Sequence, residues 1–172
     1  MVIAAMAIET DPVREAFMKK ISKILAPTDY SDLSCIGLGR AFETARETGA
    51  ELIVMHVVAM SDDWFSKHQE LSPVRNLMKE QKEFLDRFLR AKFAESINLV
   101  EVSQKVEPGT PYSNIVELAA REDVDLIIMS THGRTGVDHI MLGSVTEKVI
   151  AHAPCPVLAI PSTAHTKLPK AA

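Results

Sequence analysis

The chain has 172 residues, of which 47% are hydrophobic and 24% are charged. This length suits one domain, and the composition excludes a wholly disordered or fibrous chain. The formal net charge is -4, from 19 Lys and Arg against 23 Asp and Glu. Because proteins that bind nucleic acid through its phosphates are usually basic, we expect no nucleic-acid partner. The two cysteines, Cys35 and Cys155, are too few for a disulfide scaffold.

The two ends of the chain are expected to lie outside the core. We predict an N-terminal extension over 1–19, a folded domain over 20–161 and a C-terminal tail over 162–172. The apolar start MVIAAMAI has no basic region before it, and Glu9 and Asp11 follow at once, which is not typical of a signal peptide. Every apolar run is shorter than the ~20 residues of a membrane span. We therefore expect a cytoplasmic protein without a membrane partner.

The first half of the domain alternates between predicted strands and helices. In chain order the sequence predicts a strand over Lys20–Pro27, a helix from Ser31 to Thr48, a strand over Glu51–Val58, an irregular polar segment over 59–72 and a helix over 73–95. Ser31 is a typical N-cap and Gly49 a typical C-terminal stop. The run Glu51–Val58 is apolar nearly throughout, as expected of a strand buried on both faces of a parallel sheet.

The second half continues the alternation. It predicts a strand over Asn98–Val106, a helix from Pro111 with Thr110 as its cap, a strand over Asp125–Ser130, a loop over Thr131–Leu142, a helix over Ser144–His152 and a strand over Val157–Ile160. In Asn98–Val106 valines alternate with charged residues, which is typical of a half-exposed edge strand. Ser144 and Glu147 predict a capping box at the start of the last helix.

This order of elements predicts an α/β fold. Parallel strands need crossover connections, and nearly all such crossovers are right-handed. We expect a doubly wound, three-layer domain with a five-stranded parallel sheet in the order 3-2-1-4-5. Ligands of such sheets bind beyond the carboxyl ends of the strands, where the strand order reverses.

The segment after the fourth predicted strand has the features of an anion site. Gly133, Gly136 and Gly143 permit positive φ and let backbone N–H groups approach an anion closely. The helix that starts at Ser144 offers free N–H donors and the positive end of its dipole, which together favour phosphate. We therefore predict a phosphate cradle formed by main-chain donors around Gly133 and Gly143.

Two positions on the first two strands complete the hypothetical site. Asp29 is an acceptor of the kind that holds ribose hydroxyls, and Val57 offers an apolar wall for an adenine ring. The sequence contains neither G-x-G-x-x-G nor G-x-x-x-x-G-K-[ST], so a Rossmann dinucleotide site and a Walker P-loop are not indicated. Two simpler interpretations stay open: the glycine-rich loop is only structural, and Asp29 only caps the helix that follows the first strand.

Three other candidates for catalytic or metal-binding residues have weaker support from the sequence. Ser130, His132 and Asp138 are the residue types of a nucleophilic triad, but nothing in the sequence places them in the required geometry. The pair His152-x-x-Cys155 lacks a second pair of zinc ligands. His56, which lies inside an apolar run, is more typical of a hydrogen-bonded core or rim residue than of a metal ligand.

Three segments, in order, resemble the universal stress protein family: KILAPTDYS, ELIVMHVV and IIMSTHGRTG…LGSVTEKVIAHAPCPVLAIP. The resemblance covers about Lys20 to Pro161. ATP-binding members of this family carry G-x2-G-x9-G-[ST], and the matching positions here are Ser130, Gly133, Gly143 and Ser144. The first glycine is thus replaced by Ser130. Because a serine does not adopt a strongly positive φ cheaply, this departure bears on nucleotide affinity.

The resemblance implies a ligand, a site and a partner. The ligand would be ATP, with Mg²⁺ or Mn²⁺ as the accompanying cation. Family members are commonly dimers joined through the last strand, here Val157–Ile160, whose apolar edge favours pairing in a closed two-fold dimer. The implied nucleotide-binding residues are Pro27, Thr28, Asp29 and Val57 for adenosine, Met129, Ser130, His132, Gly133 and Arg134 for the pocket wall, and Gly143, Ser144, Val145 and Thr146 for the phosphates.

The leading hypothesis is an adenine-nucleotide-binding stress-response protein. It would act as a dimeric ligand-dependent switch or chaperone-like factor rather than as a fast enzyme. One alternative is a slow ATP hydrolase, for which the sequence offers no convincing general base. The other is a dimeric interaction protein that binds no nucleotide, an interpretation that Ser130 favours.

Overall fold

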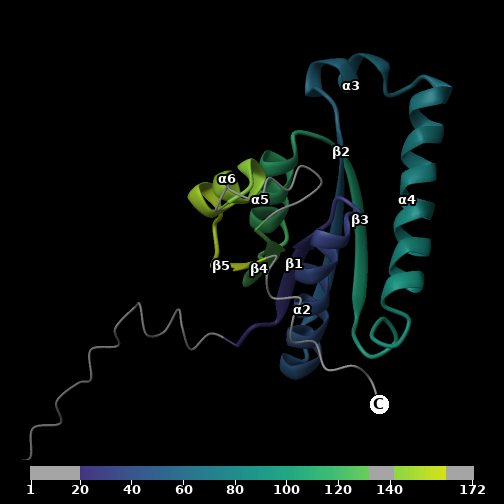
Figure 1. Ribbon diagram of the computed structural model, residues 1–172. Coiled ribbons are helices and arrows are strands. Elements are labelled where there is room, and N and C mark those ends of the chain that lie inside the picture. The colour runs from purple at the N-terminus through teal and green to yellow at the C-terminus, as the bar shows by residue number, and fades with distance from the viewer. Residues whose placement is uncertain (1–19, 132–141, 162–172) are drawn as a thin grey trace, which may run out of the picture.

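A five-stranded parallel sheet forms the middle layer of the molecule (Figure 1). The computed structural model describes residues 20–131 and 142–161. The strands are β1 (Lys23–Pro27), β2 (Glu51–Ala59), β3 (Val102–Gly109), β4 (Leu126–Ser130) and β5 (Val157–Ile160). Their order is β3-β2-β1-β4-β5, and every neighbouring pair is parallel. The predicted fold class and strand order are confirmed, and the order reverses between β1 and β4.

Helices cover both faces of this sheet. They are α2 (Asp32–Thr48), α3 (Asp62–His68), α4 (Ser72–Lys92), α5 (Pro111–Arg121) and α6 (Ser144–His152). The core residues of α2 and α4 pack together on one face, and those of α5 and α6 pack on the other (Figure 1). Within the described residues, no helix is both long enough and apolar enough to cross a membrane.

The alternation of side chains along β1 explains why its three central residues are all apolar. Ile24 and Ala26 face the core formed with α2 and α4, whereas Leu25 faces the core formed with α5 and α6. All three side chains are fully buried. The middle of a central parallel strand thus has no solvent-facing side, and polar residues lie beside it only at the two ends, Lys23 at the start and Thr28 at the cavity described below.

Several element boundaries differ from the prediction. β1 begins at Lys23 rather than Lys20, β4 at Leu126 rather than Asp125, and α4 ends at Lys92 rather than near 95. Asp125 instead accepts hydrogen bonds from the N–H and hydroxyl groups of Ser22, at 2.9 and 2.7 Å. This contact holds the chain just before β1 against the residue that precedes β4.

Two larger differences concern the segments on either side of α4. The segment 59–72, predicted to be irregular, contains the helix α3, because the Ser61 hydroxyl caps it by accepting from the Trp64 N–H at 3.3 Å. β3 starts four residues later than predicted and extends through Pro108. Proline lacks an N–H donor and is tolerated there because β3 is an edge strand, as its alternating sequence predicted.

Candidate functional site

A cavity of about 590 Å³ opens at the carboxyl ends of β1, β2 and β4, where the strand order reverses. Ten of the predicted nucleotide-binding residues line it: Pro27, Thr28, Asp29, Val57, Met129, Ser130, Gly143, Ser144, Val145 and Thr146. The other three, His132, Gly133 and Arg134, lie outside the described residues, as does Asp138 of the triad considered above. The structure therefore brings together the carboxyl ends of β1, β2 and β4 and the start of α6 at one cavity.

Further lining residues were not predicted. They are Ser34, Met55, His56, Val58, Ala59, Gln81, Pro111 and Ile115. The residues around Val57 could have been found, because the carboxyl end of β2 lies beside that of β1. Gln81 and Ile115 come from α4 and α5, and no local sequence pattern indicates which helical residue reaches the cavity.

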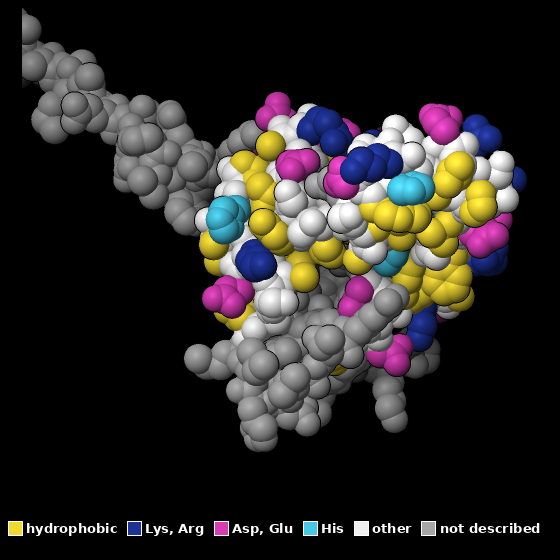
Figure 2. Space-filling model, turned by 90° about the horizontal axis from the view of Figure 1, so that it is seen from above, with side chains coloured by type: hydrophobic (Ala, Val, Ile, Leu, Met, Phe, Trp, Pro, Cys, Tyr) yellow, Lys and Arg dark blue, Asp and Glu magenta, His cyan; other side chains and the backbone are white. Residues whose placement is uncertain are grey.

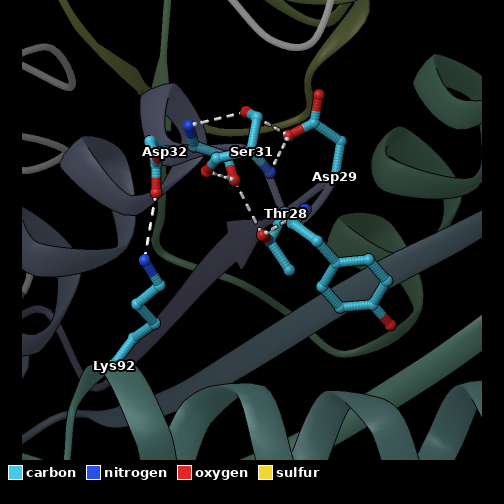
Figure 3. A network of polar contacts seen from close by, with 7 residues as sticks. Thr28, Asp29, Ser31, Asp32 and Lys92 are labelled. Atoms are coloured by element: carbon cyan, nitrogen blue, oxygen red, sulfur yellow. Dashed lines mark hydrogen bonds and ion pairs between the residues drawn. The ribbon is translucent and has the colours of Figure 1, made fainter.

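A network of polar contacts shapes the turn between β1 and α2 (Figure 3). Asp29 Oδ1 accepts hydrogen bonds from the Ser31 N–H at 3.0 Å and from the Ser31 hydroxyl at 2.6 Å. Ser31 Oγ in turn accepts from the Ser34 N–H at 3.0 Å, so Ser31 is the N-cap of α2, as predicted. Asp29 is not the cap itself; it orients the residue that caps the helix, and it also lines the cavity.

Thr28 connects this turn to the rest of the sheet. Its N–H donates to the Met55 carbonyl at 2.8 Å, and its hydroxyl lies 2.9 Å from the hydroxyl of Ser34. His56 Nδ1 lies 2.9 Å from the Thr28 carbonyl, and the His56 side chain is only 8% exposed. The predicted role of His56 as a buried, hydrogen-bonded residue is confirmed.

The start of α6 differs from the predicted capping box. Gly143 is the N-cap, Ser144 is the first helical residue, and the cap makes no side-chain hydrogen bond. Gly143 has φ −69°, so it does not use the positive φ open to glycine, and its N–H donates to the Thr131 carbonyl at 2.7 Å. The N–H groups of Ser144, Val145 and Thr146, in the first turn of α6, have no intrahelical acceptors.

Further hydrogen bonds hold β4 against the elements beside it. The Thr146 hydroxyl donates to the Ser130 carbonyl at 3.1 Å, and the Thr131 N–H donates to the Ile160 carbonyl at 2.9 Å. Thr146 is only 3% exposed. Ser130 ends β4 and is not among the described non-glycine residues with positive φ. A serine at this glycine position of the family pattern therefore carries no left-handed strain.

Cys35 lies in the first turn of α2, close to this network. Burial raises the pKa of its thiol, an effect that the charge of Lys92 opposes and those of Asp32 and Asp29 reinforce. The side chain packs against the core formed with α2 and α4. Cys35 is thus a thiol at neutral pH, as expected of an apolar packing residue rather than a redox centre.

Charged side chains of both signs lie at the end of the molecule that carries α3 (Figure 2). Figure 2 looks down on the end of the molecule that carries α3, and on its coloured part acidic, basic and hydrophobic side chains are interspersed. Among the described residues, no group of three or more His, Cys, Asp and Glu side chains is arranged to hold a metal ion. The described part of this face therefore has neither the basic stripe of a nucleic-acid surface nor a protein-only metal centre.

Residues 20–161 match the family model described as the universal stress protein family. The chain belongs to this family. Universal stress protein MJ0531 of Methanocaldococcus jannaschii is 36% identical over 139 residues, which cover 80% of this chain and 81% of that protein. The solved structure of MJ0577 from the same organism is 29% identical, has a TM-score of 0.63, and the match covers 83% of this chain and 96% of that one.

A second solved structure shares the fold at lower identity. It is the universal stress protein from Archaeoglobus fulgidus in complex with dAMP, 22% identical, with a TM-score of 0.55. The match covers 81% of this chain and 97% of that chain.

Proposed function

We propose that this chain binds an adenine nucleotide in the cavity, with ATP as the ligand. The observation that carries the proposal is the convergence of three features at one switch point of the sheet. These are an apolar wall, the Asp29 carboxylate, and the open N-terminus of α6. A nucleotide has a matching sequence of parts, namely an apolar base, a sugar with hydroxyl donors, and anionic phosphates.

The positions of these features assign each part of the ligand to a place in the cavity. The base lies against Val57, Ile115 and Met129, and Asp29 accepts hydrogen bonds from the ribose. The phosphates lie at the N–H groups of Ser144 to Thr146. The residues His132, Gly133 and Arg134 are proposed to complete the phosphate site on the grounds of the family pattern. The relative that was solved in complex with dAMP supports a ligand of this class.

The residues present fit a nucleotide better than they fit a free metal ion. The described residues offer no cluster of protein ligands for a cation. We therefore assign Mg²⁺ or Mn²⁺ the role of a phosphate-bound companion of ATP, where it neutralises phosphate charge. Asp29 and His56 are the described lining residues able to accept a proton, and both already bond to the β1–α2 turn. For this reason we do not propose ATP hydrolysis.

The position of the site also suggests how binding would reach a partner. The N–H of Thr131 bonds to the carbonyl of Ile160, the last residue of β5, and α6 leads directly into β5. We propose that the chain is a homodimer joined through Val157–Ile160 and that ligand bound at α6 changes this edge. The protein would then act as a ligand-dependent switch in the stress response.

Mass spectrometry and a melting experiment test the binding directly. Nucleotide released from the purified, denatured protein is identified by mass, and the melting temperature is measured with and without added ATP. At 100 times its dissociation constant, ATP should stabilise the fold by roughly 2.7 kcal/mol.

A matched pair of variants locates the binding. Asp29→Ala should greatly reduce the stabilisation by ATP, whereas Asp63→Ala, which removes an exposed carboxylate from α3, should keep it. If ATP leaves the melting temperature of the unaltered protein unchanged at millimolar concentration, the chain is instead a family member that acts without a nucleotide.

A further inference from the structure

Tyr30 adopts a backbone conformation that is unusual for a residue with a side chain. Its φ is +66°, in the left-handed region where the Cβ atom is crowded by the backbone. Tyr30 stands between Asp29 and Ser31, and the turn at this residue brings the Ser31 N–H back to the Asp29 carboxylate. The direction of that carboxylate therefore depends on an unfavourable conformation that other contacts must hold in place.

The aromatic ring of Tyr30 supplies such contacts. It stacks on His56 of β2, with ring centroids 4.0 Å apart and an interplanar angle of 28°. It also meets Phe84 and Phe88 of α4 edge-on, at centroid distances of 4.7 and 5.2 Å. His56 is itself held at the Thr28 carbonyl. The ring is thus clamped between β2 and α4, whose contacting residues lie 26 or more positions after Tyr30 in the sequence.

We propose that Tyr30 is a positioning residue of the nucleotide site. Its clamped ring keeps the β1–α2 turn in the left-handed form that aims Asp29 at the sugar of the ligand. This inference rests on the proposed function. Because the turn is already ordered in the folded protein, the entropic cost of ordering it does not reduce the free energy of ligand binding. The same ring links the affinity of the site to the position of α4, which also lines the cavity through Gln81.

Three variants separate positioning from simple packing. Tyr30→Phe keeps the ring contacts and removes only the long hydrogen bond, 3.4 Å, from the Tyr30 hydroxyl to the Gln81 carbonyl. Tyr30→Gly removes the ring while relieving the backbone strain. Phe93→Leu is the control, because Phe93 packs against the same core and stacks on Phe42, with ring centroids 4.9 Å apart, rather than on Tyr30 or His56. For each variant we would measure the dissociation constant for ATP, the melting temperature without ligand, and hydrogen exchange of the Ser31 amide by NMR.

The expected pattern separates affinity from stability. Tyr30→Phe should bind ATP within about twofold of the unaltered chain, and Tyr30→Gly about tenfold more weakly, because the turn must then be ordered on binding. The melting temperature of Tyr30→Gly should fall no further than that of Phe93→Leu. The Ser31 amide should exchange faster in Tyr30→Gly alone, because its acceptor, Asp29, is no longer held.

Two results would overturn the proposal. One is an equal change of ATP affinity in Tyr30→Gly and Phe93→Leu, and the other is an unchanged Ser31 exchange rate in Tyr30→Gly. If the unaltered chain binds no ATP, the proposed function fails on its own, and Ser31 exchange still decides whether Tyr30 holds the turn.

Discussion

At Gly37 the helix α2 packs directly against the backbone of β4. A Cβ atom at this position would lie 2.6 Å from the Ser130 nitrogen and 2.9 Å from the Met129 carbonyl carbon. Both are backbone atoms of residues that line the cavity. The first turns of α2 can therefore reach β4 only because residue 37 has no side chain, and this contact helps to place the β1–α2 turn beside the end of β4.

A pair of glycines in the same helix tests this contact. Gly37→Ala should destabilise the fold by roughly 1–3 kcal/mol, because backbone must move to admit the methyl group. Gly39→Ala should stabilise it by about 0.5–1 kcal/mol, because alanine favours the helix and the nearest atom, Cε1 of Phe93, is 3.9 Å away. Urea unfolding of both variants measures the difference. Equal effects at the two positions would show that α2 does not depend on the contact at Gly37.

At the scale of residues, the sequence identified the parts of the site that lie at strand ends. Asp29 and Val57 could be found because apolar runs stop at or beside them and because parallel strands end at one edge. Met129 was named only from the family resemblance. The conformation of Tyr30 could not, because tyrosine is not expected at positive φ and the ring contacts that hold it come from β2 and α4. Likewise, no sequence pattern indicates the hydrogen bond from the Gly143 N–H to the Thr131 carbonyl, because it is a tertiary contact.

Two helices with predicted caps differ in how they are capped. Ser31 accepts a hydrogen bond from the Ser34 N–H at the start of α2, whereas Thr110 makes no side-chain cap bond at the start of α5. Ser31→Ala should therefore cost about 1 kcal/mol of stability. Thr110→Ala should change stability by less than about 0.5 kcal/mol. Thermal unfolding distinguishes the two, and a Thr110→Ala loss as large as that of Ser31→Ala would contradict the assignment of the caps.

A salt bridge on the edge strand makes part of the stability depend on pH. Lys105 Nζ of β3 lies 3.1 Å from Glu122 Oε1. The hydrogen bond from Lys105 is the main cause of the lowered pKa of Glu122, and the positive charge of Lys105 lowers it further. Because the folded state holds the carboxylate more strongly than the unfolded chain does, this stabilisation is present above the ordinary value of 4.5. It is lost as the pH falls through the lowered pKa.

Glu122→Gln tests this dependence. Its stability should be below that of the unaltered protein at pH 7, and the difference should shrink as the pH falls below 4.5. Lys105→Met should remove the same pH-dependent part. Urea unfolding at pH 7, 5 and 3.5 provides the comparison, and a difference that stays constant over this range would mean that the salt bridge contributes nothing to folding.

At the scale of elements, the strands and helices that could be predicted from the sequence are the ones that are most buried. β1, β2 and β4 were found because strands buried on two faces are apolar along most of their length. α3 was missed because it is short, mostly exposed, and depends on a cap at Ser61. The predicted bounds of β3 were wrong because its partly exposed sequence has no apolar run that marks its ends. Its actual bounds follow the pairing with Leu52–Ala59 of β2.

The two edges of the sheet have opposite character. β3 carries Lys105 and Glu107, each in a salt bridge, and Pro108, which cannot donate to a neighbouring strand. Such features block pairing with another sheet. β5 is a short run of apolar residues in which Leu158 is 39% exposed. A dimer through Val157–Ile160 is therefore favoured over one through β3.

Light scattering tests the proposed dimer with a matched pair of leucines. Leu158→Glu should convert the dimer to a monomer, because it places a charge on the pairing edge. Leu99→Glu, at a position that is 61% exposed just before β3, should leave the mass of the dimer unchanged. Circular dichroism confirms that both variants fold. A dimer that survives Leu158→Glu, or that is lost in Leu99→Glu, would place the interface elsewhere.

The central claim for the whole molecule is that a nucleotide spans the cavity from Val57 to the start of α6. An NMR titration of the backbone amides with adenosine and then with ATP tests it most directly. Both ligands should shift the amides of Asp29 and Val57, and only ATP should also shift those of Ser144, Val145 and Thr146, because only ATP brings phosphates to that helix end. Nucleotide binding across this cavity is ruled out if ATP shifts none of these amides, or if adenosine and ATP shift the α6 amides equally.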